Sequence, residues 1–205
     1  MKIAIFGASG RTGILTVYQA LEKGHEVTAF ARTPSSVTIT HKNLRIIRGD
    51  ILEFEKVKAA VEGQDVVILT LGTYTRKYST VLSEGTANII RAMNETAVKR
   101  LICMSSVGIL KDDGGFWFGK IILPLFLKQE FEDKKRQMDL IRESNLDWVI
   151  IRPVTLTQAP KTGKYKIYDN KPGSSKIPRA DVADFILKLL TDKKYDGQIP
   201  AISSY

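Results

Sequence analysis

The chain has 205 residues, which suits one well-packed domain and is short for two. Its apolar fraction of 43% and charged fraction of 26% are ordinary for a globular protein, and its formal net charge is +9. Apart from the run Lys134–Arg136, expected to be a solvated helix face, the basic residues are spread out. This distribution favours small anionic ligands over nucleic acid. Two histidines and one cysteine are too few for a zinc cluster, so no metal site is expected.

Cys103 is the only cysteine and lies in an apolar run, so we expect a buried side chain and no internal disulfide. The first expected strand begins at residue 2, which leaves no room for a signal peptide ahead of it. These features favour a cytoplasmic protein. No membrane association is expected, because no stretch reaches the roughly 20 apolar residues of a membrane span.

Strand-like and helix-like segments alternate along the chain, which predicts a parallel sheet with helices on both faces. The expected strands are Lys2–Gly7, Glu26–Arg32, Leu44–Asp50, Val66–Gly72, Arg100–Ser106 and Trp148–Pro153, with a further strand at Lys164–Asp169. The expected helices are Arg11–Lys23, Phe54–Glu62, Ser79–Ala97, Lys128–Ser144 and Arg179–Asp192. The sequence therefore predicts an α/β fold with a doubly wound parallel sheet, as a single domain over residues 1–205.

The first expected strand runs directly into Gly7, Gly10 and Gly13. Glycine permits a tight strand-to-helix turn, a close backbone approach to a pyrophosphate and close helix packing. The start of the following helix offers unpaired N–H groups and a positive dipole end to phosphates. This G-x-x-G-x-x-G turn between a strand and a helix predicts a dinucleotide bound to a Rossmann-like fold. The other cofactor-binding residues expected in the turn are Ser9, Arg11 and Thr12.

The second expected strand ends at Arg32, about 20 residues beyond the glycines. An NAD-preferring site carries an acidic residue there, which binds the ribose 2′-hydroxyl. A guanidinium suits a 2′-phosphate instead, and Arg11 is placed to support it. The sequence therefore predicts NADP(H) in preference to NAD(H), with a merely solvent-facing Arg32 as the alternative.

The third and fourth strand ends are expected to extend the same site, because open parallel sheets bind ligands beyond the carboxyl ends of their strands. Asp50 and Ile51 follow the third strand on the adenine side. Asp50 equally suits the N-cap of the next helix. Leu71, Gly72 and Thr73 end the fourth strand, where glycine lets the backbone approach the ribose and nicotinamide.

The fifth and sixth strand ends are expected on the nicotinamide side. Ser105 and Ser106 end the fifth strand, where their hydroxyls are placed to bind the nicotinamide or a substrate carbonyl. Capping of the following loop is the alternative role for these hydroxyls. Pro153 and Val154 end the sixth strand, as a wall beside the nicotinamide.

Residues 107–127 interrupt the alternation of strands and helices. A turn signal at 112–115 precedes an apolar run from Phe116 to Leu127, which is too short and interrupted to span a membrane. It is expected either to pack on the sheet edge, or to form a flap beside the ligand or a subunit contact. Tyr74 and Trp117 are candidate stacking surfaces for a flat substrate, with a core position as the alternative.

The chain resembles the atypical short-chain dehydrogenase/reductases, in their NAD(P)-binding, NmrA-like group. The resemblance covers nearly the whole length and rests on KIAIFGASGRTG, Arg32, Gly49-Asp50, the LGT at 71–73, the serines at 105 and 106, Arg152-Pro153 and Arg179–Ala183. Within this group it is most similar to the biliverdin-IXβ reductases, also called flavin reductases. The resemblance implies NADPH as cofactor and hydride transfer to flavins, tetrapyrroles or quinones, with Ser106 as the active-site serine.

No tyrosine of this chain has a lysine four residues later, the pair with which ordinary short-chain dehydrogenases relay a proton. Lys134 is expected at the position of that lysine, but Glu130 stands four residues earlier. Reduction of an isolated ketone needs a nearby general acid, whereas a conjugated acceptor spreads the charge and takes its proton from solvent. The missing pair therefore favours a flat acceptor such as FMN or a bilin, oriented by Ser106.

The alternative function is a non-catalytic NADP-binding sensor or regulator of the NmrA type, which uses the same glycine turn. The apolar run 116–127 would provide its partner surface. The paired serines and the compact length favour the enzyme. The expected state is a monomer or a weak homo-oligomer.

Overall fold

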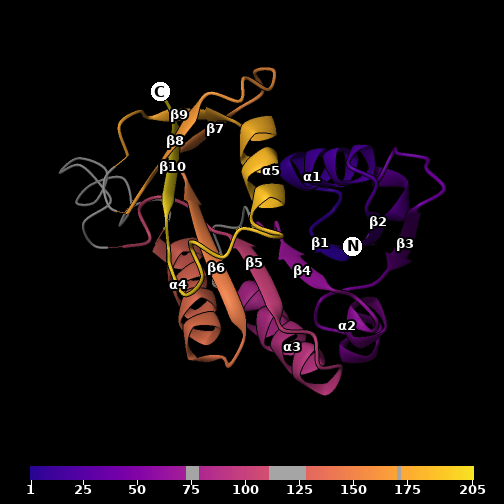
Figure 1. Cartoon of the computed structure of the whole chain (residues 1–205). Helices are drawn as coiled ribbons and strands as arrows, with labels where there is room; N and C mark the ends of the chain where they lie inside the picture. The colour runs from indigo at the N-terminus through magenta and orange to yellow at the C-terminus, as the bar shows by residue number, and fades with distance from the viewer. Residues whose placement is uncertain (73–78, 111–127, 170–171) are drawn as a thin grey trace.

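The structure is a computed structural model, and it describes residues 1–72, 79–110, 128–169 and 172–205 (Figure 1). Its elements are β1 (Lys2–Phe6), α1 (Arg11–Glu22), β2 (Glu26–Ala31), η1 (Pro34–Ser36), β3 (Leu44–Arg48), α2 (Phe54–Val61), β4 (Val66–Leu69), α3 (Val81–Glu95), β5 (Arg100–Met104), α4 (Lys128–Glu143), β6 (Asp147–Pro153), β7 (Thr155–Thr157), β8 (Tyr165–Tyr168), β9 (Lys176–Pro178), α5 (Arg179–Lys188) and β10 (Ala201–Ser204).

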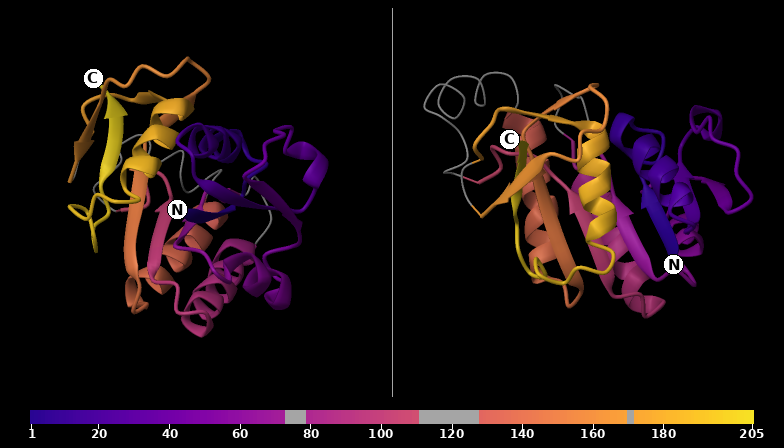
Figure 2. Two further views of the ribbon diagram at one scale, coloured as in Figure 1. Left: turned by 45° about the vertical axis from the view of Figure 1, so that its right-hand side comes forward. Right: turned by 45° about the horizontal axis from the view of Figure 1, so that its top comes forward.

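Eight strands form the main sheet, in the order β3-β2-β1-β4-β5-β6-β10-β8, and only β8 runs antiparallel to its neighbour. Helices α1 and α5 cover one face, and α2, α3 and α4 cover the other (Figures 1 and 2). The strand order reverses between β1 and β4, which is the point where doubly wound sheets bind ligands. The predicted α/β fold is confirmed.

Helices on both faces explain why the inner strands are apolar without alternation. All four residues of β4 are buried, as are four of the five in β1. Successive side chains of β1 enter two different cores: Ile3 and Ile5 pack toward α1 and α5, whereas Ala4 and Phe6 pack toward α2 and α3. The two cores together fix β1 in the middle of the sheet.

The six predicted parallel strands are present, and the first five end one to three residues earlier than expected. β8 lies within the further strand predicted at Lys164–Asp169. Strands β7, β9 and β10 were not predicted, because they have only three or four residues each and no apolar run to mark them. β10 inserts between β6 and β8 and so carries the sheet beyond its expected edge.

A buried polar cluster joins α5 to the segment before β8. The Asp184 carboxylate accepts hydrogen bonds from the Tyr165 hydroxyl and the Lys161 ammonium, both at 2.7 Å, and lies 3.0 Å from the Lys188 ammonium. Burial alone raises the pKa of Asp184, but these three hydrogen-bond partners outweigh it and lower that pKa to about 2. The fully buried Asp181 accepts two further backbone N–H groups of the same segment.

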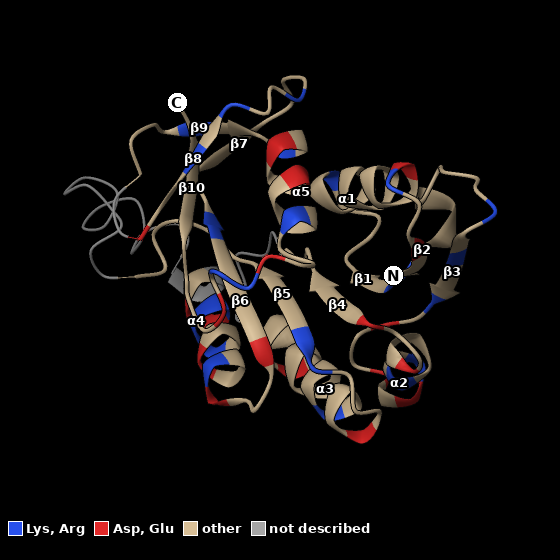
Figure 3. Cartoon of the chain, viewed as in Figure 1, with Lys and Arg blue, Asp and Glu red and all other residues tan. Residues whose placement is uncertain are grey.

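The basic run on α4 is only in part the solvated face that the sequence predicts. Lys135 is exposed, but Lys134 is half-buried, with its ammonium 5.5 Å from the centre of the Phe131 ring. Arg136 donates to the Ser79 carbonyl at 3.1 Å. Elsewhere the outer faces of the helices carry both signs of charge (Figure 3).

Cys103 is 1% exposed, as predicted, and burial raises the pKa of its thiol to about 12. A thiol with that pKa stays protonated near neutral pH and has little nucleophilic character. Within the described ranges, no helix combines the length and apolarity that crossing a membrane requires.

Candidate functional site

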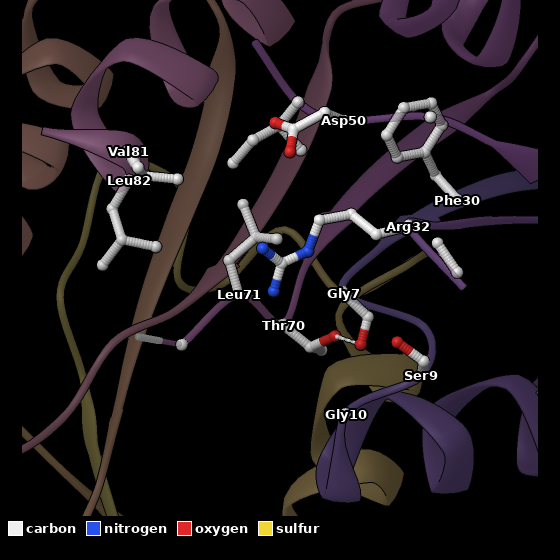
Figure 4. Close-up of a pocket in the computed structure, with 14 residues that line it drawn as sticks. Gly7, Ser9, Gly10, Phe30, Arg32, Asp50, Thr70, Leu71, Val81 and Leu82 are labelled. Atoms are coloured by element: carbon white, nitrogen blue, oxygen red, sulfur yellow. Dashed lines mark hydrogen bonds between the residues drawn. The ribbon is translucent and has the colours of Figure 1, made fainter. Parts of the chain in front are cut away.

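A cleft lies at the carboxyl ends of β1, β2, β3 and β4 (Figure 4). Residues of its wall that the sequence singles out are Gly7, Ser9, Gly10, Arg32, Asp50, Ile51, Leu71 and Gly72. Lining residues that the sequence does not single out as site residues are Phe30, Ala31, Gly49, Thr70, Val81 and Leu82. Residues that are distant in sequence thus meet where the strand order reverses.

Gly7 and Gly13 of the turn have no room for a side chain. Gly7 has a φ of +80°, and a Cβ there would lie 2.8 Å from the Thr70 carbonyl oxygen. A Cβ on Gly13 would lie 2.1 Å from the Gly7 carbonyl oxygen and 2.8 Å from Thr70 Oγ1. The Thr70 hydroxyl donates to the carbonyls of Phe6 and Gly7, at 3.0 and 3.2 Å. Thr70, directly after β4, therefore packs against the turn and fixes its conformation.

The N-terminus of α1 is open for an anion. Gly10 is its N-cap, no described side chain caps it, and its first turn contains no acidic residue. The Ile14 N–H donates to the Gly10 carbonyl at 2.9 Å and is the first to bond inside the helix. The N–H groups of Arg11, Thr12 and Gly13 find no backbone acceptor among the described residues. Such unpaired groups, together with the helix dipole, favour a phosphate.

Arg32 stands directly after β2, and Figure 4 shows its guanidinium projecting into the cleft. The side chain is exposed and forms no salt bridge with a described residue. A guanidinium in this position offers several donors to a phosphate group.

Asp50 and Ile51 lie after β3 and line the cleft. The interpretation of Asp50 as the N-cap of α2 is wrong, because Glu53 holds that position. The Asp50 carboxylate instead accepts the Leu52 N–H at 3.0 Å in a turn that precedes the helix. Ile51 packs against α3 where a glycine makes space, since a Cβ on Gly85 would lie 2.3 Å from Ile51 Cδ1.

Ser105 and Ser106 follow β5, beside the end of β4. Both hydroxyl oxygens are buried and have no hydrogen-bond partner among the described residues. The backbone there is nevertheless paired with β6: the Ser105 N–H donates to Ile151 at 2.8 Å, and the Val107 N–H to Pro153 at 3.0 Å. Because buried hydroxyls are nearly always hydrogen-bonded, these two oxygens call for a partner that the described residues do not supply.

Pro153 and Val154 are buried at the end of β6, and the Val154 N–H donates to Ile202 of β10 at 3.2 Å. Neither residue belongs to the wall of the cleft at β1–β4. Arg11, Thr12 and Gly13, in the first turn of α1, and Ser105 and Ser106, after β5, are likewise not among the residues that line this cleft. Predicted site residues outside the described ranges are Thr73, Tyr74 and Trp117, together with most of the segment 107–127.

Among the lining residues that were not predicted, Phe30 and Gly49 could have been found from their places near predicted strand ends. Val81 and Leu82 could not. The Phe30 ring packs at a tilt of 41° against the Phe6 ring, with 4.8 Å between the ring centroids. Gly49 leaves room for the Phe30 ring, since a Cβ on Gly49 would lie 2.5 Å from it. Phe30 and Gly49 each adjoin a predicted strand end. Val81 and Leu82 begin α3, and their place in the cleft depends on how that helix docks.

A family model described as NAD(P)H-binding matches residues 7–193, from the glycine turn to a point beyond α5. The chain belongs to this NAD(P)H-binding family. The cleft fits the family's cofactor, because it combines a turn whose glycines leave no room for a Cβ, an uncapped helix N-terminus and a projecting guanidinium.

Several solved structures are similar to this chain over almost its whole length. The oxidoreductase ylbE from Lactococcus lactis is 25% identical, with 100% of this chain and 91% of that one covered and a TM-score of 0.86. A short-chain dehydrogenase/reductase from Veillonella parvula in complex with NADP is 19% identical, with 99% and 94% covered and a TM-score of 0.84. The anaerobilin reductase ChuY from Escherichia coli is 23% identical, with 100% and 97% covered and a TM-score of 0.84. The last two show the fold.

Proposed function

We propose that the protein is an NADPH-dependent reductase of a flat conjugated acceptor: a flavin, a biliverdin-type tetrapyrrole or a quinone. The buried, unpartnered hydroxyls of Ser105 and Ser106 carry this proposal. Each costs about 1–3 kcal/mol of folding free energy unless a ligand satisfies it. Binding of the cofactor phosphates alone would not offset this cost, because the phosphates would bind at the start of α1 and not at the end of β5.

The cofactor side of the proposal rests on three features of the cleft. The N-terminus of α1 holds the pyrophosphate, and Arg32 holds the 2′-phosphate and selects NADPH over NADH. Ile51 and Leu71 offer apolar contacts to the adenosine half. When bound, NADPH supplies the hydride.

On the acceptor side, Ser105 and Ser106 orient the nicotinamide amide and the acceptor carbonyl. The acceptor gains two electrons as a hydride and one proton from water. A conjugated ring system spreads the resulting charge, so a neighbouring tyrosine acid is unnecessary. The proposal is also supported by the similarity of this chain to an oxidoreductase and to an anaerobilin reductase. The proposal places the chain with the biliverdin and flavin reductases of the NmrA-like group.

The test is an assay of NADPH oxidation. Purified protein is mixed with NADPH and an excess of FMN, a bilin or a simple quinone, and the absorbance of the reduced nicotinamide is followed. We expect turnover above the rate without protein for at least one acceptor. NADPH binding without turnover of any of the three would contradict the reductase and favour an NADP-binding sensor.

A further inference from the structure

A second helix begins at the cleft, and its N-terminal N–H groups are already occupied. Val81 and Leu82 open α3 and line the cleft. Asp133 of α4 accepts the Leu82 N–H at 2.9 Å, the Ser83 N–H at 3.1 Å and the Ser83 hydroxyl at 2.5 Å. A carboxylate from one helix thus fills the anion position at the start of another.

This contact is buried and is reinforced from the same helix. Asp133 is only 1% exposed. The Arg136 guanidinium lies 3.4 Å from the Asp133 carboxylate and also donates to the Ser79 carbonyl at 3.1 Å, just ahead of α3. Because charge-assisted hydrogen bonds are short and directional, this arrangement fixes where α3 starts.

We infer that Asp133 is a positioning residue for the cofactor. Its carboxylate holds Val81 and Leu82 as the wall that faces Ser9 across the cleft in Figure 4. It also fills the second helix N-terminus at the cleft, so the cofactor phosphates bind at α1 alone. This inference deepens the proposed function and rests on it for the cofactor only, not for the acceptor.

The same two helices provide a matched control. One turn further along α4, Gln137 Nε2 donates to Thr86 Oγ1 of α3 at 2.9 Å. Both residues are buried, at 3% and 0% exposure, and neither lines the cleft. Substitution of Gln137 therefore disturbs the packing of α3 on α4 without releasing the start of α3.

The experiment compares Asp133→Asn, Asp133→Ala and Gln137→Met with the parent protein. NADPH dissociation constants come from titration without acceptor, and Tm from thermal unfolding. We expect Asp133→Asn to raise the NADPH dissociation constant about tenfold. Gln137→Met should change it by less than about twofold at a similar loss of Tm. Formate, which replaces the missing carboxylate, should restore affinity and Tm in Asp133→Ala alone.

The inference would be overturned by unchanged NADPH affinity in Asp133→Asn, or by an equal loss of affinity in Gln137→Met at the same Tm. Absence of any formate effect on Asp133→Ala would also contradict it. If Asp133→Ala does not fold, Asp133→Asn carries the test, because it keeps the side-chain size and one acceptor oxygen. An inactive reductase does not affect this titration, so failure of the proposed reaction and failure of the inference are distinguishable.

Discussion

The glycine turn after β1 and the serine pair after β5 leave different kinds of polar group without a hydrogen-bond partner among the described residues. At the turn the backbone makes the site: Gly7 and Gly13 admit no side chain, and the open groups are helix N–H groups. After β5 the N–H groups of Ser105 and Val107 are paired with β6, and the open groups are the hydroxyls of Ser105 and Ser106. The proposed cofactor end therefore depends on the backbone of the fold, whereas the proposed acceptor end depends on side chains that can be replaced.

Gly13→Ala should have the largest effect of these variants, on both the stability of the glycine turn and its affinity for NADPH. The added methyl group collides with backbone atoms of Gly7, so we expect a loss of about 1–3 kcal/mol in unfolding free energy. NADPH affinity should fall by about 100-fold or more, since the turn and the start of α1 both shift. Urea unfolding and NADPH titration measure the two effects. Tyr18→Ala, at a half-exposed position of α1, is the control. Unchanged NADPH binding in Gly13→Ala would show that the turn does not hold the cofactor.

Arg32→Asp should change the specificity of that region while sparing the fold. NADPH binding should weaken by about 1–3 kcal/mol, because a charge-assisted hydrogen bond to the 2′-phosphate is lost. NADH affinity should stay the same or rise. Parallel titrations with both nucleotides measure this, with Arg45→Asp as a control, because this exposed arginine lies near the opposite end of β3. Equal NADPH and NADH affinity in the parent protein would remove the role assigned to Arg32.

Ser106→Ala should affect only the serine pair after β5 and leave the glycine turn unchanged. We expect acceptor reduction to slow by about tenfold, as for loss of one orienting hydrogen bond. NADPH affinity should stay nearly unchanged. Single-turnover kinetics with FMN or a bilin and NADPH titration separate the two effects. Ser36→Ala, at an exposed serine of η1, serves as the comparison. A variant as fast as the parent would reduce Ser106 to a structural residue.

Ser105→Ala should have the smallest effect, and in the free protein it should stabilise the fold slightly if it changes stability at all. Removal of an unpartnered buried hydroxyl should leave the unfolding free energy unchanged or raise it by up to about 1 kcal/mol. The extra stability that NADPH confers should shrink. Thermal unfolding with and without NADPH tests both statements. A clear drop in the Tm of the free protein would mean that the hydroxyl has a partner.

The sequence was most informative where local geometry decides the structure. The turn at Gly7 and the place of Arg32 follow from one strand and one helix start, and both line the cleft. The role of Asp50 was ambiguous, because an Asx turn and an N-cap use the same side chain, and Glu53 took the cap. Short-range patterns therefore predict an element more reliably than its first residue.

Features that depend on the docking of two helices were not predictable. Val81 and Leu82 reach the cleft only because α4 holds the start of α3, and the Asp133 contact joins residues about fifty positions apart. No periodicity or spacing encodes such a contact. β10 was missed for a related reason, since four residues with two serines become a strand only between β6 and β8.

The Asp184 carboxylate binds a proton less readily in the folded protein than in the unfolded chain. The pKa of this carboxyl group is about 2 in the fold, against about 3.9 for an unperturbed aspartate. The cluster therefore stabilises the fold above about pH 4, and this contribution is lost as the pH falls toward 2. The difference in unfolding free energy between the parent and Asp184→Asn should shrink over that interval. Urea unfolding of both proteins across this pH range measures the trend, and a pH-independent Asp184→Asn difference would refute this linkage.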